Sequence, residues 1–183
     1  MKKLGTVRLE TERLILRRFK LNDVENVYNG WVRDKETTKY LSWNIHKNIE
    51  ETEEIIRNWI NEYENGYYHW VVELKQTGDL IGSISSVNIN YKNNNLEIGY
   101  CYSSKHWGNG YATEALRRVI EFLLLECDVY LIETRHISGN PASGRVMEKA
   151  GMKKDGVLRN RRINKATGEY NDLIYYSITK DEL

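Results

Sequence analysis

A glycine-containing segment in the middle of the chain has the residue types of an anion-binding loop. Residues 107–113 read Trp-Gly-Asn-Gly-Tyr-Ala-Thr and join a predicted strand to the most regular helical pattern of the sequence. Gly108 and Gly110 let the backbone approach a ligand closely, and the free N–H groups of the first helical turn, at residues 111–113, point toward the same place. A pyrophosphate fits such a loop, although two glycines this close together can also form a simple tight turn.

Two other classes of phosphate-binding loop are disfavoured by the same residues. The P-loop of nucleoside triphosphatases ends in Gly-Lys-Ser or Gly-Lys-Thr, and this loop does not. A dinucleotide-binding loop has a glycine or alanine where Thr113 stands, and an acidic residue at the end of the next strand. Asp128 has about the right spacing, but it precedes its predicted strand, and the strands ahead of the loop read as an antiparallel meander.

Hydrophobic periodicity predicts the elements that position this loop. The strongest helical spacing covers residues 111–127, directly after the glycines. The alternation within the strand pattern fails between Ile84 and Val87, which indicates a bulge. Period-two alternation predicts strands over residues 13–18, 68–74, 80–91, 96–102, 129–137, 157–164 and 170–178.

Three further helices are marked by capping residues, with Asn or Asp at the start and, in two of them, Gly at the end. No repeat, low-complexity tract or linker interrupts the elements, so residues 1–183 are expected to form one domain of the α+β class. The helices are expected from Asn22-Asp23 to Trp31, from Asn48 to Gly66, and from Asn140-Pro141 to Gly151.

Composition excludes several classes of function. Twenty-seven Lys and Arg against 26 Asp and Glu leave a net charge of +1, so no overall field would gather nucleic acid or an anionic membrane. No apolar run approaches the roughly 18 residues of a membrane-spanning helix, so we expect a cytoplasmic protein. Cys101 and Cys127 read as small buried thiols, and none of the four histidines pairs with them at a metal-ligand spacing, so no metal is expected.

Several segments carry a resemblance to a known family. Residues 97–100 and 107–115 contain Glu-Ile-Gly-Tyr and the glycine loop, and they are flanked by residues 9–17 and 140–152. These segments are similar to the acetyl-coenzyme A motif, the opening strand and the closing helix of the GNAT superfamily, in particular its RimJ/RimL-like ribosomal-protein N-terminal acetyltransferases. The resemblance implies the GNAT fold, which is a mixed, mostly antiparallel sheet of about seven strands with helices on both faces.

The same resemblance implies an N-acetyltransferase that moves the acetyl group of acetyl-CoA to a primary amine, such as a protein N-terminus, by direct attack in a ternary complex. A polyamine or an aminoglycoside remains open as the acceptor. A coenzyme-binding sensor without turnover also remains open. The tyrosine-rich terminal hairpin could pair two copies of the chain in a homodimer.

The resemblance also implies where acetyl-CoA binds. The coenzyme would lie between the strands of residues 96–102 and 129–137, with a backbone N–H near Tyr100 or Cys101 facing the thioester carbonyl. Lys105 stands where the superfamily pattern usually has Gln or Arg. The expected coenzyme-binding residues are Tyr100, Cys101, Lys105, Gly108, Asn109, Gly110, Tyr111, Ala112, Thr113, Asn140 and Ser143.

Two side chains are candidates for proton transfer. In the resemblance, Glu97 takes the position of a general base, whereas by residue type alone it would be a solvated strand residue. Ser143 lies one turn after Asn140 and could give a proton to the departing thiolate, or it could be an ordinary exposed serine. Asn140 is itself a good N-cap before Pro141, and this role is compatible with holding the coenzyme.

The acceptor side is less well defined by the sequence. Tyr40 and Trp43 could line it, as the corresponding connection does in the resembling family, or they could close an edge of the core. A basic run at Arg159, Arg161 and Arg162 could steer an acidic acceptor, although such a run is often only a solvated strand face.

Overall fold

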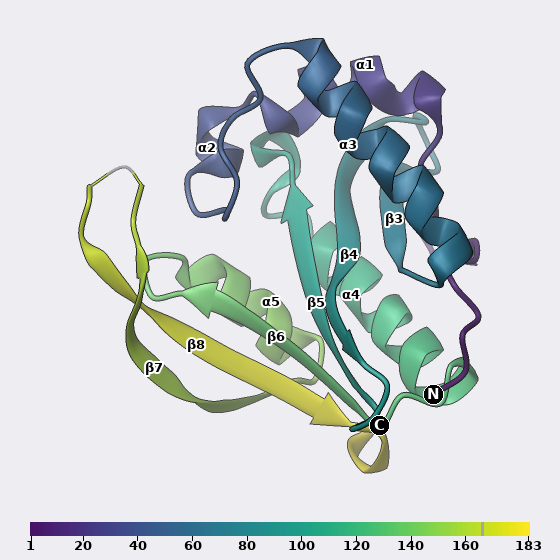
Figure 1. The fold of residues 1–183 in the computed structure, drawn as a ribbon, viewed down its shortest axis with the longest axis vertical. Coiled ribbons are helices and arrows are strands. Elements are labelled where there is room, and N and C mark those ends of the chain that lie inside the picture. The colour runs from purple at the N-terminus through teal and green to yellow at the C-terminus, as the bar shows by residue number, and fades with distance from the viewer. Residues whose placement is uncertain (166) are drawn as a thin grey trace.

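The computed structural model describes residues 1–165 and 167–183, and its centre is one eight-stranded sheet in the order β1-β2-β3-β4-β5-β6-β8-β7 (Figure 1). Neighbouring strands are antiparallel except for β5 and β6, which run parallel. The strands are β1 Leu9–Glu10, β2 Leu14–Arg18, β3 His69–Leu74, β4 Leu80–Asn90, β5 Asn95–Tyr102, β6 Leu131–Ile137, β7 Lys153–Ile163 and β8 Tyr170–Thr179. The mixed, mostly antiparallel sheet predicted from the sequence is therefore confirmed.

The sheet has one strand more than the sequence pattern indicated. The additional strand, β1, contains only two residues and pairs with β2 through Leu9 and Leu16, so it is too short to show an alternation. β7 also begins at Lys153, before the alternation at Val157 becomes visible. Both differences concern strand segments whose side chains carry little periodic signal.

Within the described residues, five α-helices accompany the sheet: α1 Val24–Val27, α2 Lys35–Thr38, α3 Ile49–Glu62, α4 Tyr111–Glu121 and α5 Pro141–Lys149. The predicted caps of α3 and α5 are confirmed. Asn48 Oδ1 accepts the Glu51 N–H at 3.0 Å, and Asn140 Oδ1 accepts the Ser143 N–H at 3.3 Å. The final turns after α3 and α5 end at Gly66 and Gly151, which have φ values of 81° and 96°. Positive φ is where glycine is favoured over other residues.

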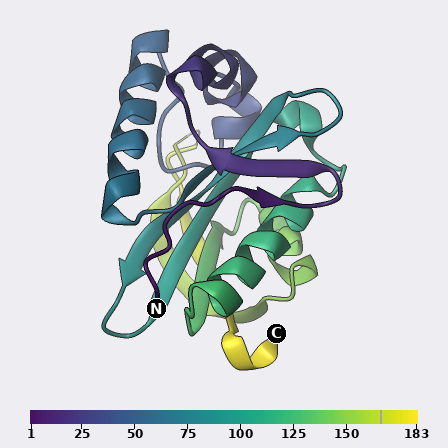
Figure 2. The same cartoon turned by 90° about the vertical axis from the view of Figure 1, so that its right-hand side faces the viewer.

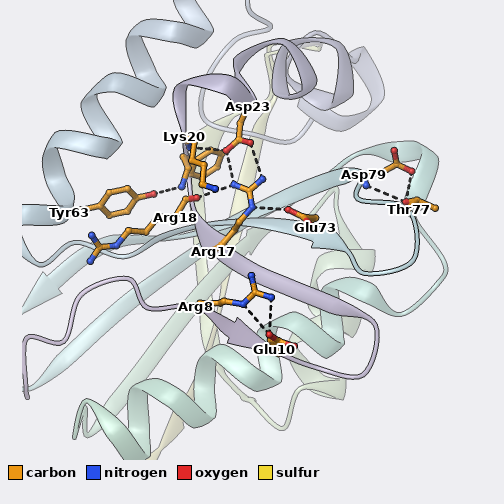
Figure 3. Close-up of polar contacts among 11 residues, drawn as sticks. Arg8, Glu10, Arg17, Arg18, Lys20, Asp23, Tyr63, Glu73, Thr77 and Asp79 are labelled. Atoms are coloured by element: carbon orange, nitrogen blue, oxygen red, sulfur yellow. Dashed lines mark hydrogen bonds and ion pairs between the residues drawn. The ribbon is translucent and has the colours of Figure 1, made fainter.

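The first predicted helix is less regular than expected. Residues 21–32 form a 3₁₀ turn, the single turn of α1 and a π-helical turn in succession, and α2 follows as an unpredicted short helix capped by Asp34. Asp23 is held by a buried ion pair. Arg17 of β2 contacts both Asp23 carboxylate oxygens, at 2.8 and 2.9 Å, and its Nε donates to Glu73 of β3 at 2.7 Å (Figure 3). These contacts fix the start of α1 to two strands of the sheet.

Two hydrophobic cores cover the two faces of the sheet. On β3, Trp70 and Val72 point to the core shared with α4 and α5, whereas Val71 between them points to the core shared with α1 and α3. This is the alternation expected for a strand covered on both sides. In Figure 2, α3 and α4 lie on opposite sides of the sheet. The predicted placement of helices on both faces is confirmed.

The centre of the sheet is split between β5 and β6. The two strands pair only from Asn95↔Leu131 to Glu97↔Glu133, and beyond this point they diverge (Figure 1). β5 then keeps only β4 as a partner, and β6 keeps only β8. On the other edge of β5, the register of β4 shifts between Ser86 and Asn88, which confirms the predicted bulge and leaves Val87 without a cross-strand partner. A gap with free strand edges therefore opens in the middle of the molecule.

Candidate functional site

A cavity of about 740 Å³ occupies the gap between β5 and β6. Alternation along β5 divides its lining between the two faces of the sheet. Leu96 and Ile98 belong to the α4–α5 core, so Tyr100 and Tyr102 lie on that face, whereas Glu97 and Cys101 lie on the other. We call the part next to the first turns of α4 and α5 the α4 compartment, and the part next to residues 40–42 and Glu97 the α2 compartment. The site thus passes through the sheet.

The glycine loop forms one end of the α4 compartment. Gly108 and Gly110 have φ values of 79° and 81°, so both occupy the left-handed region that favours glycine. Gly110 is the N-cap of α4 and offers no side chain to the N–H groups of Tyr111, Ala112 and Thr113, all of which line the cavity. No atom lies within 4 Å of the position that a Cβ on Gly108 would take. The backbone is therefore open to a ligand, and the helix dipole favours an anionic one.

Two of the expected coenzyme ligands in this loop face elsewhere. Asn109 uses its side-chain amide to hold the loop together, donating to the carbonyl oxygens of His106 and Trp107 at 3.1 and 3.2 Å. Lys105 is exposed, and neither Lys105 nor Asn109 is among the residues that line the cavity. Trp107 lines it with a ring fixed by a 2.7 Å hydrogen bond from Nε1 to the Tyr102 carbonyl oxygen.

Arg13 anchors the loop and was not identified from the sequence. Its Nη1 donates to the Asn109 carbonyl oxygen at 3.0 Å, its Nε donates to Glu114 at 2.7 Å, and its guanidinium lies 4.6 Å from the centre of the Tyr111 ring. Burial alone would raise the pKa of Glu114, but hydrogen bonds from Thr11 and Arg13 outweigh it and lower the pKa. An ionised Glu114 thus fixes the loop to the turn between β1 and β2.

The open edge of β5 presents backbone groups to the cavity. The Ser103 N–H donates to the Ile81 carbonyl oxygen of β4 at 2.9 Å, and backbone groups along a strand point alternately to its two sides. The Tyr100 N–H and carbonyl therefore point away from β4, toward the gap, whereas those of Cys101 point to β4. Of the two residues expected to supply an N–H to the site, Tyr100 has the suitable orientation.

Tyr100 and Ser143 come together on the α4 side of the gap. Their hydroxyl oxygens lie 2.9 Å apart, and the Tyr100 hydroxyl also donates to the Ser143 carbonyl oxygen at 3.0 Å. Burial raises the pKa of Tyr100, so the phenol stays protonated at neutral pH. Asn140, the N-cap of α5, lines the cavity beside them. The side-chain partnership of Tyr100 with Ser143 joins residues 43 positions apart, which no local pattern could reveal.

Glu97 is a buried carboxylate in the α2 compartment. It is 8% exposed, lines the cavity, and forms a 3.1 Å ion pair with Nε of Arg135 on β6. Burial raises the pKa of Glu97, and the charge of Arg135 opposes this shift only in part. Arg135 also donates from Nη1 to the Tyr175 hydroxyl at 2.7 Å. Sequence reasoning placed Glu97 on this face, but it did not identify Arg135 as its partner.

The two residues expected on the acceptor side separate in the structure. Tyr40 lines the α2 compartment together with Leu41 and Ser42. Trp43 is not among the lining residues; it packs against the α1–α3 core, with its ring 5.4 Å from that of His46. Trp43 therefore closes an edge of the core, which was the alternative to a place on the acceptor side.

Basic side chains surround the cavity. Arg117, Arg145 and Lys149 line the groove between α4 and α5, and Arg162 of β7 lines the α2 compartment. None of the first three stands out by spacing in the sequence, because residues of two separate helices form the groove. Their positive charges, with the open glycine backbone, fit a polyanionic ligand such as the phosphates of coenzyme A.

No group of three or more His, Cys, Asp or Glu in residues 1–165 and 167–183 could hold a metal ion. Cys101 and Cys127 are both free thiols. Within the same ranges, no helix is long and apolar enough to cross a membrane.

Comparisons with known proteins identify the family of the chain. Residues 13–153 match the family model of the acetyltransferase (GNAT) domain. The uncharacterized N-acetyltransferase YoaA of Bacillus subtilis is 32% identical over 94% of this chain and 96% of its own. An acetyltransferase of the GNAT family from Bacillus anthracis has a solved structure with a TM-score of 0.84 and 25% identity, covering 96% of this chain and 99% of its own.

A further solved structure shares the fold at lower identity. It is the ribosomal-protein-S5-alanine acetyltransferase from Vibrio fischeri, with a TM-score of 0.84 and 21% identity, covering 96% of this chain and 97% of its own.

Proposed function

Because this chain belongs to the GNAT acetyltransferase family and is an N-acetyltransferase that uses acetyl-CoA, we propose that it acetylates the α-amino group of a protein N-terminus. The observation that carries the proposal is the cavity through the sheet. It has an open helix N-terminus on one face and a buried carboxylate on the other, so an activated acyl donor and an amine can meet in the gap between β5 and β6.

We assign the α4 compartment to acetyl-CoA, which supplies the acetyl group as a thioester. The backbone of the glycine loop and the first turn of α4 would hold the pyrophosphate, and Arg117, Arg145 and Lys149 would add positive charge for the phosphates. The free edges of β5 and β6 can pair with the amide groups of the pantetheine arm in the manner of an added strand. The Tyr100 N–H at the open edge would then donate to the thioester carbonyl oxygen and stabilise negative charge developing on it.

The chemistry we propose is direct attack by the amine. The ammonium group first gives one proton to Glu97, directly or through water. The neutral nitrogen then forms a bond to the carbonyl carbon, the carbon–sulfur bond breaks, and the thiolate takes a proton from Ser143, whose hydroxyl contacts that of Tyr100. The nitrogen loses its second proton to solvent, a proton from solvent returns to the Ser143 oxygen, and Glu97 releases the proton that it took. The products are an amide and free coenzyme A.

Two features favour a protein N-terminus over other amines. The segments that resemble RimJ/RimL-like enzymes extend over most of the chain. An α-amino group also has a reference pKa near 7.7–8.0, so a single buried carboxylate is enough to deprotonate it at neutral pH. Polyamines and aminoglycosides remain alternative acceptors, and a coenzyme sensor without turnover remains the alternative outside catalysis.

The decisive experiment measures free CoA released from acetyl-CoA in the presence of peptides, spermidine and an aminoglycoside, and identifies products by mass. We expect CoA release with peptide acceptors and a mass gain on the peptide α-amino group. Binding of acetyl-CoA with no release for any acceptor would support the sensor instead, and release with spermidine alone would replace the peptide by a polyamine.

A further inference from the structure

Arg162 is a cation without a counter-ion in the α2 compartment. Among the described residues its guanidinium forms no hydrogen bond and no ion pair, although the side chain is only partly exposed and lines the cavity. Burial lowers the pKa of Arg162, and the neighbouring charge of Arg135 lowers it further. A partly buried guanidinium that has no acceptor in the protein can bind an anionic group of a ligand.

Strand register places Arg162 on the same face as Glu97. Directly opposed residues of neighbouring strands share a face of the sheet. Arg162 of β7 opposes Asn171 of β8. Residues two apart on a strand share a face, so Asn171 lies on the same face as Leu173, which opposes Ile137 of β6. By the same rule, Ile137 shares this face with Arg135. Arg135 contacts Glu97. Arg162 therefore faces the compartment to which we assign the acceptor, on the opposite side of the sheet from the glycine loop.

The charges in this compartment are divided unevenly. Arg135 is balanced by Glu97, and it also experiences the charge of Glu133, the neighbour of Glu97 across the short parallel pairing. Beside Arg162 lies a second cation, Lys165, whose Nζ donates to the neutral Asn44 side chain at 2.9 Å. Burial lowers the pKa of Lys165, and Arg162 lowers it further. Glu97 thus shares the gap with Arg135, whereas Arg162 lies on β7 and the exposed Lys165 follows β7.

Apolar side chains form part of the walls of this compartment. Leu41, Val87, Ile137 and Leu173 all line the cavity. Apolar walls keep water away and strengthen an ion contact made at their edge.

From this arrangement we infer that the acceptor carries an anionic oxygen group, a carboxylate or a phosphate, which binds Arg162 while its amine lies at Glu97. The inference rests on the proposed function and narrows it: the preferred N-terminus has an acidic or phosphorylated residue close behind its first residue. A protonated polyamine such as spermidine would place like charge against Arg162 and Lys165, so it is a poor acceptor.

The test compares matched peptides with amidated C-termini, so that the second residue carries the only anionic group. Ser-Asp-Ala, Ser-phosphoserine-Ala and Ser-Asn-Ala amides are titrated against the CoA-loaded protein, and kcat/KM is measured for each with acetyl-CoA, with spermidine as the cationic arm. We expect at least one of the two anionic peptides to exceed Ser-Asn-Ala at least tenfold in both affinity and kcat/KM. Which of the two is better shows whether the site prefers a carboxylate or a phosphate.

The variants Arg162→Gln and Arg161→Gln provide the matched control. Both remove one positive charge from β7, but Arg161 is exposed and does not line the cavity. We expect Arg162→Gln to abolish the preference for the anionic peptide over Ser-Asn-Ala, so that the ratio of their kcat/KM values is about one. Arg162→Lys should retain part of this preference, and Arg161→Gln should leave it unchanged. Circular dichroism establishes that each variant is folded.

The outcomes separate the inference from the function on which it rests. Three outcomes would overturn the inference while leaving acetyl transfer intact. They are equal kcat/KM for the charged and neutral peptides, a higher kcat/KM for spermidine than for the peptides, and a preference for anionic peptides that persists in Arg162→Gln. A loss of acetyl-CoA affinity in Arg162→Gln would also overturn it, because Arg162 would then serve the coenzyme. Conversely, Arg162-dependent binding of anionic peptides without any CoA release would support the inference and refute the proposed reaction.

Discussion

Ser143 and Tyr100 form the smallest unit to which a catalytic role can be assigned. We expect Ser143→Ala to lower kcat roughly 10²-fold, the lower end of what general acids contribute, because its help is needed only as the thiolate leaves. Acetyl-CoA affinity should stay nearly constant. Steady-state kinetics and a binding titration measure the two quantities separately.

Tyr100→Phe is the companion variant for this prediction. Tyr100 is held by the Ser143 backbone carbonyl as well as by its hydroxyl, so it keeps its place in Ser143→Ala. If the pair acts as a unit, the double variant should lose little more than Ser143→Ala alone. Equal turnover in Ser143→Ala and the parent would remove the serine from the mechanism.

Glu97 makes a prediction about pH. A base acts in its deprotonated form, so activity should fall as pH decreases through the Glu97 pKa, which burial raises above its ordinary value of 4.5 and Arg135 only partly restores. Glu97→Gln should lower kcat roughly 10²-fold, and the loss should shrink as pH rises and more of the amine is deprotonated. The loss should also be larger for a lysine side chain, with a reference pKa near 10.4, than for an α-amino group. Parallel pH profiles for Glu97→Gln and the parent would show that another group or bulk water takes the proton.

At the scale of elements, the start of α4 allows a controlled test of the loop. Gly110→Val should weaken acetyl-CoA binding at least tenfold, about 1.4 kcal/mol, because the residue has a φ of 81° and its Cβ would lie 3.5 Å from Nη2 of Arg13, which anchors the loop. A binding titration on the folded variant measures this.

Gly78→Val is the matched control for that substitution. Gly78 has a φ of 77° with no atom within 4 Å of a Cβ, and it lies in the turn between β3 and β4, outside the cavity lining. Gly78→Val therefore introduces a similar backbone strain without changing the glycine loop. Equal coenzyme affinity in both variants and the parent would mean that the glycine loop is only a turn.

At the scale of the whole molecule, three histidines link folding to pH. Burial lowers the pKa of His46, His69 and His136 below the ordinary value of 6.5. Below pH 6.5 the unfolded chain binds protons that the folded protein does not, so the free energy of unfolding falls as pH falls. Above pH 6.5 the contribution of these histidines no longer changes with pH. The slope has an upper limit of about 1.4 kcal/mol per pH unit for each histidine.

Denaturant unfolding between pH 5.5 and 7.5 measures this dependence. Glu97, with its raised pKa, acts in the opposite direction, so the difference between variants is the informative quantity. His69 lies between the rings of Trp59 and Tyr67, with centroids 5.3 and 6.2 Å away. His69→Gln should reduce the slope of stability against pH, whatever its effect on stability itself. An unchanged slope would contradict a lowered His69 pKa.

The sequence predicted those features that depend on neighbours along the chain. The caps at Asn48 and Asn140 and the bulge at Val87 were all visible, because a cap or a broken alternation is a local pattern. Contacts between distant segments were not visible. Arg13 meets Glu114 across 101 residues, and the position of Trp43 depends on how α1 and α3 pack. Arg162 was only one member of a basic run until register placed it in the cavity.

The split between β5 and β6 also bears on the order in which reactants bind. Each half of the cavity reaches solvent on its own face of the sheet, next to Trp107, which is 49% exposed, on one face and Val87, which is 54% exposed, on the other. Under our assignment, neither reactant has to pass through the site of the other, and coenzyme A can depart while the acetylated product is still bound. Under this assignment the fold requires no fixed order of substrate binding or product release. A single molecule that joins a pantetheine thiol to an acceptor amine would pass through the gap in the sheet and occupy both halves of the cavity at once.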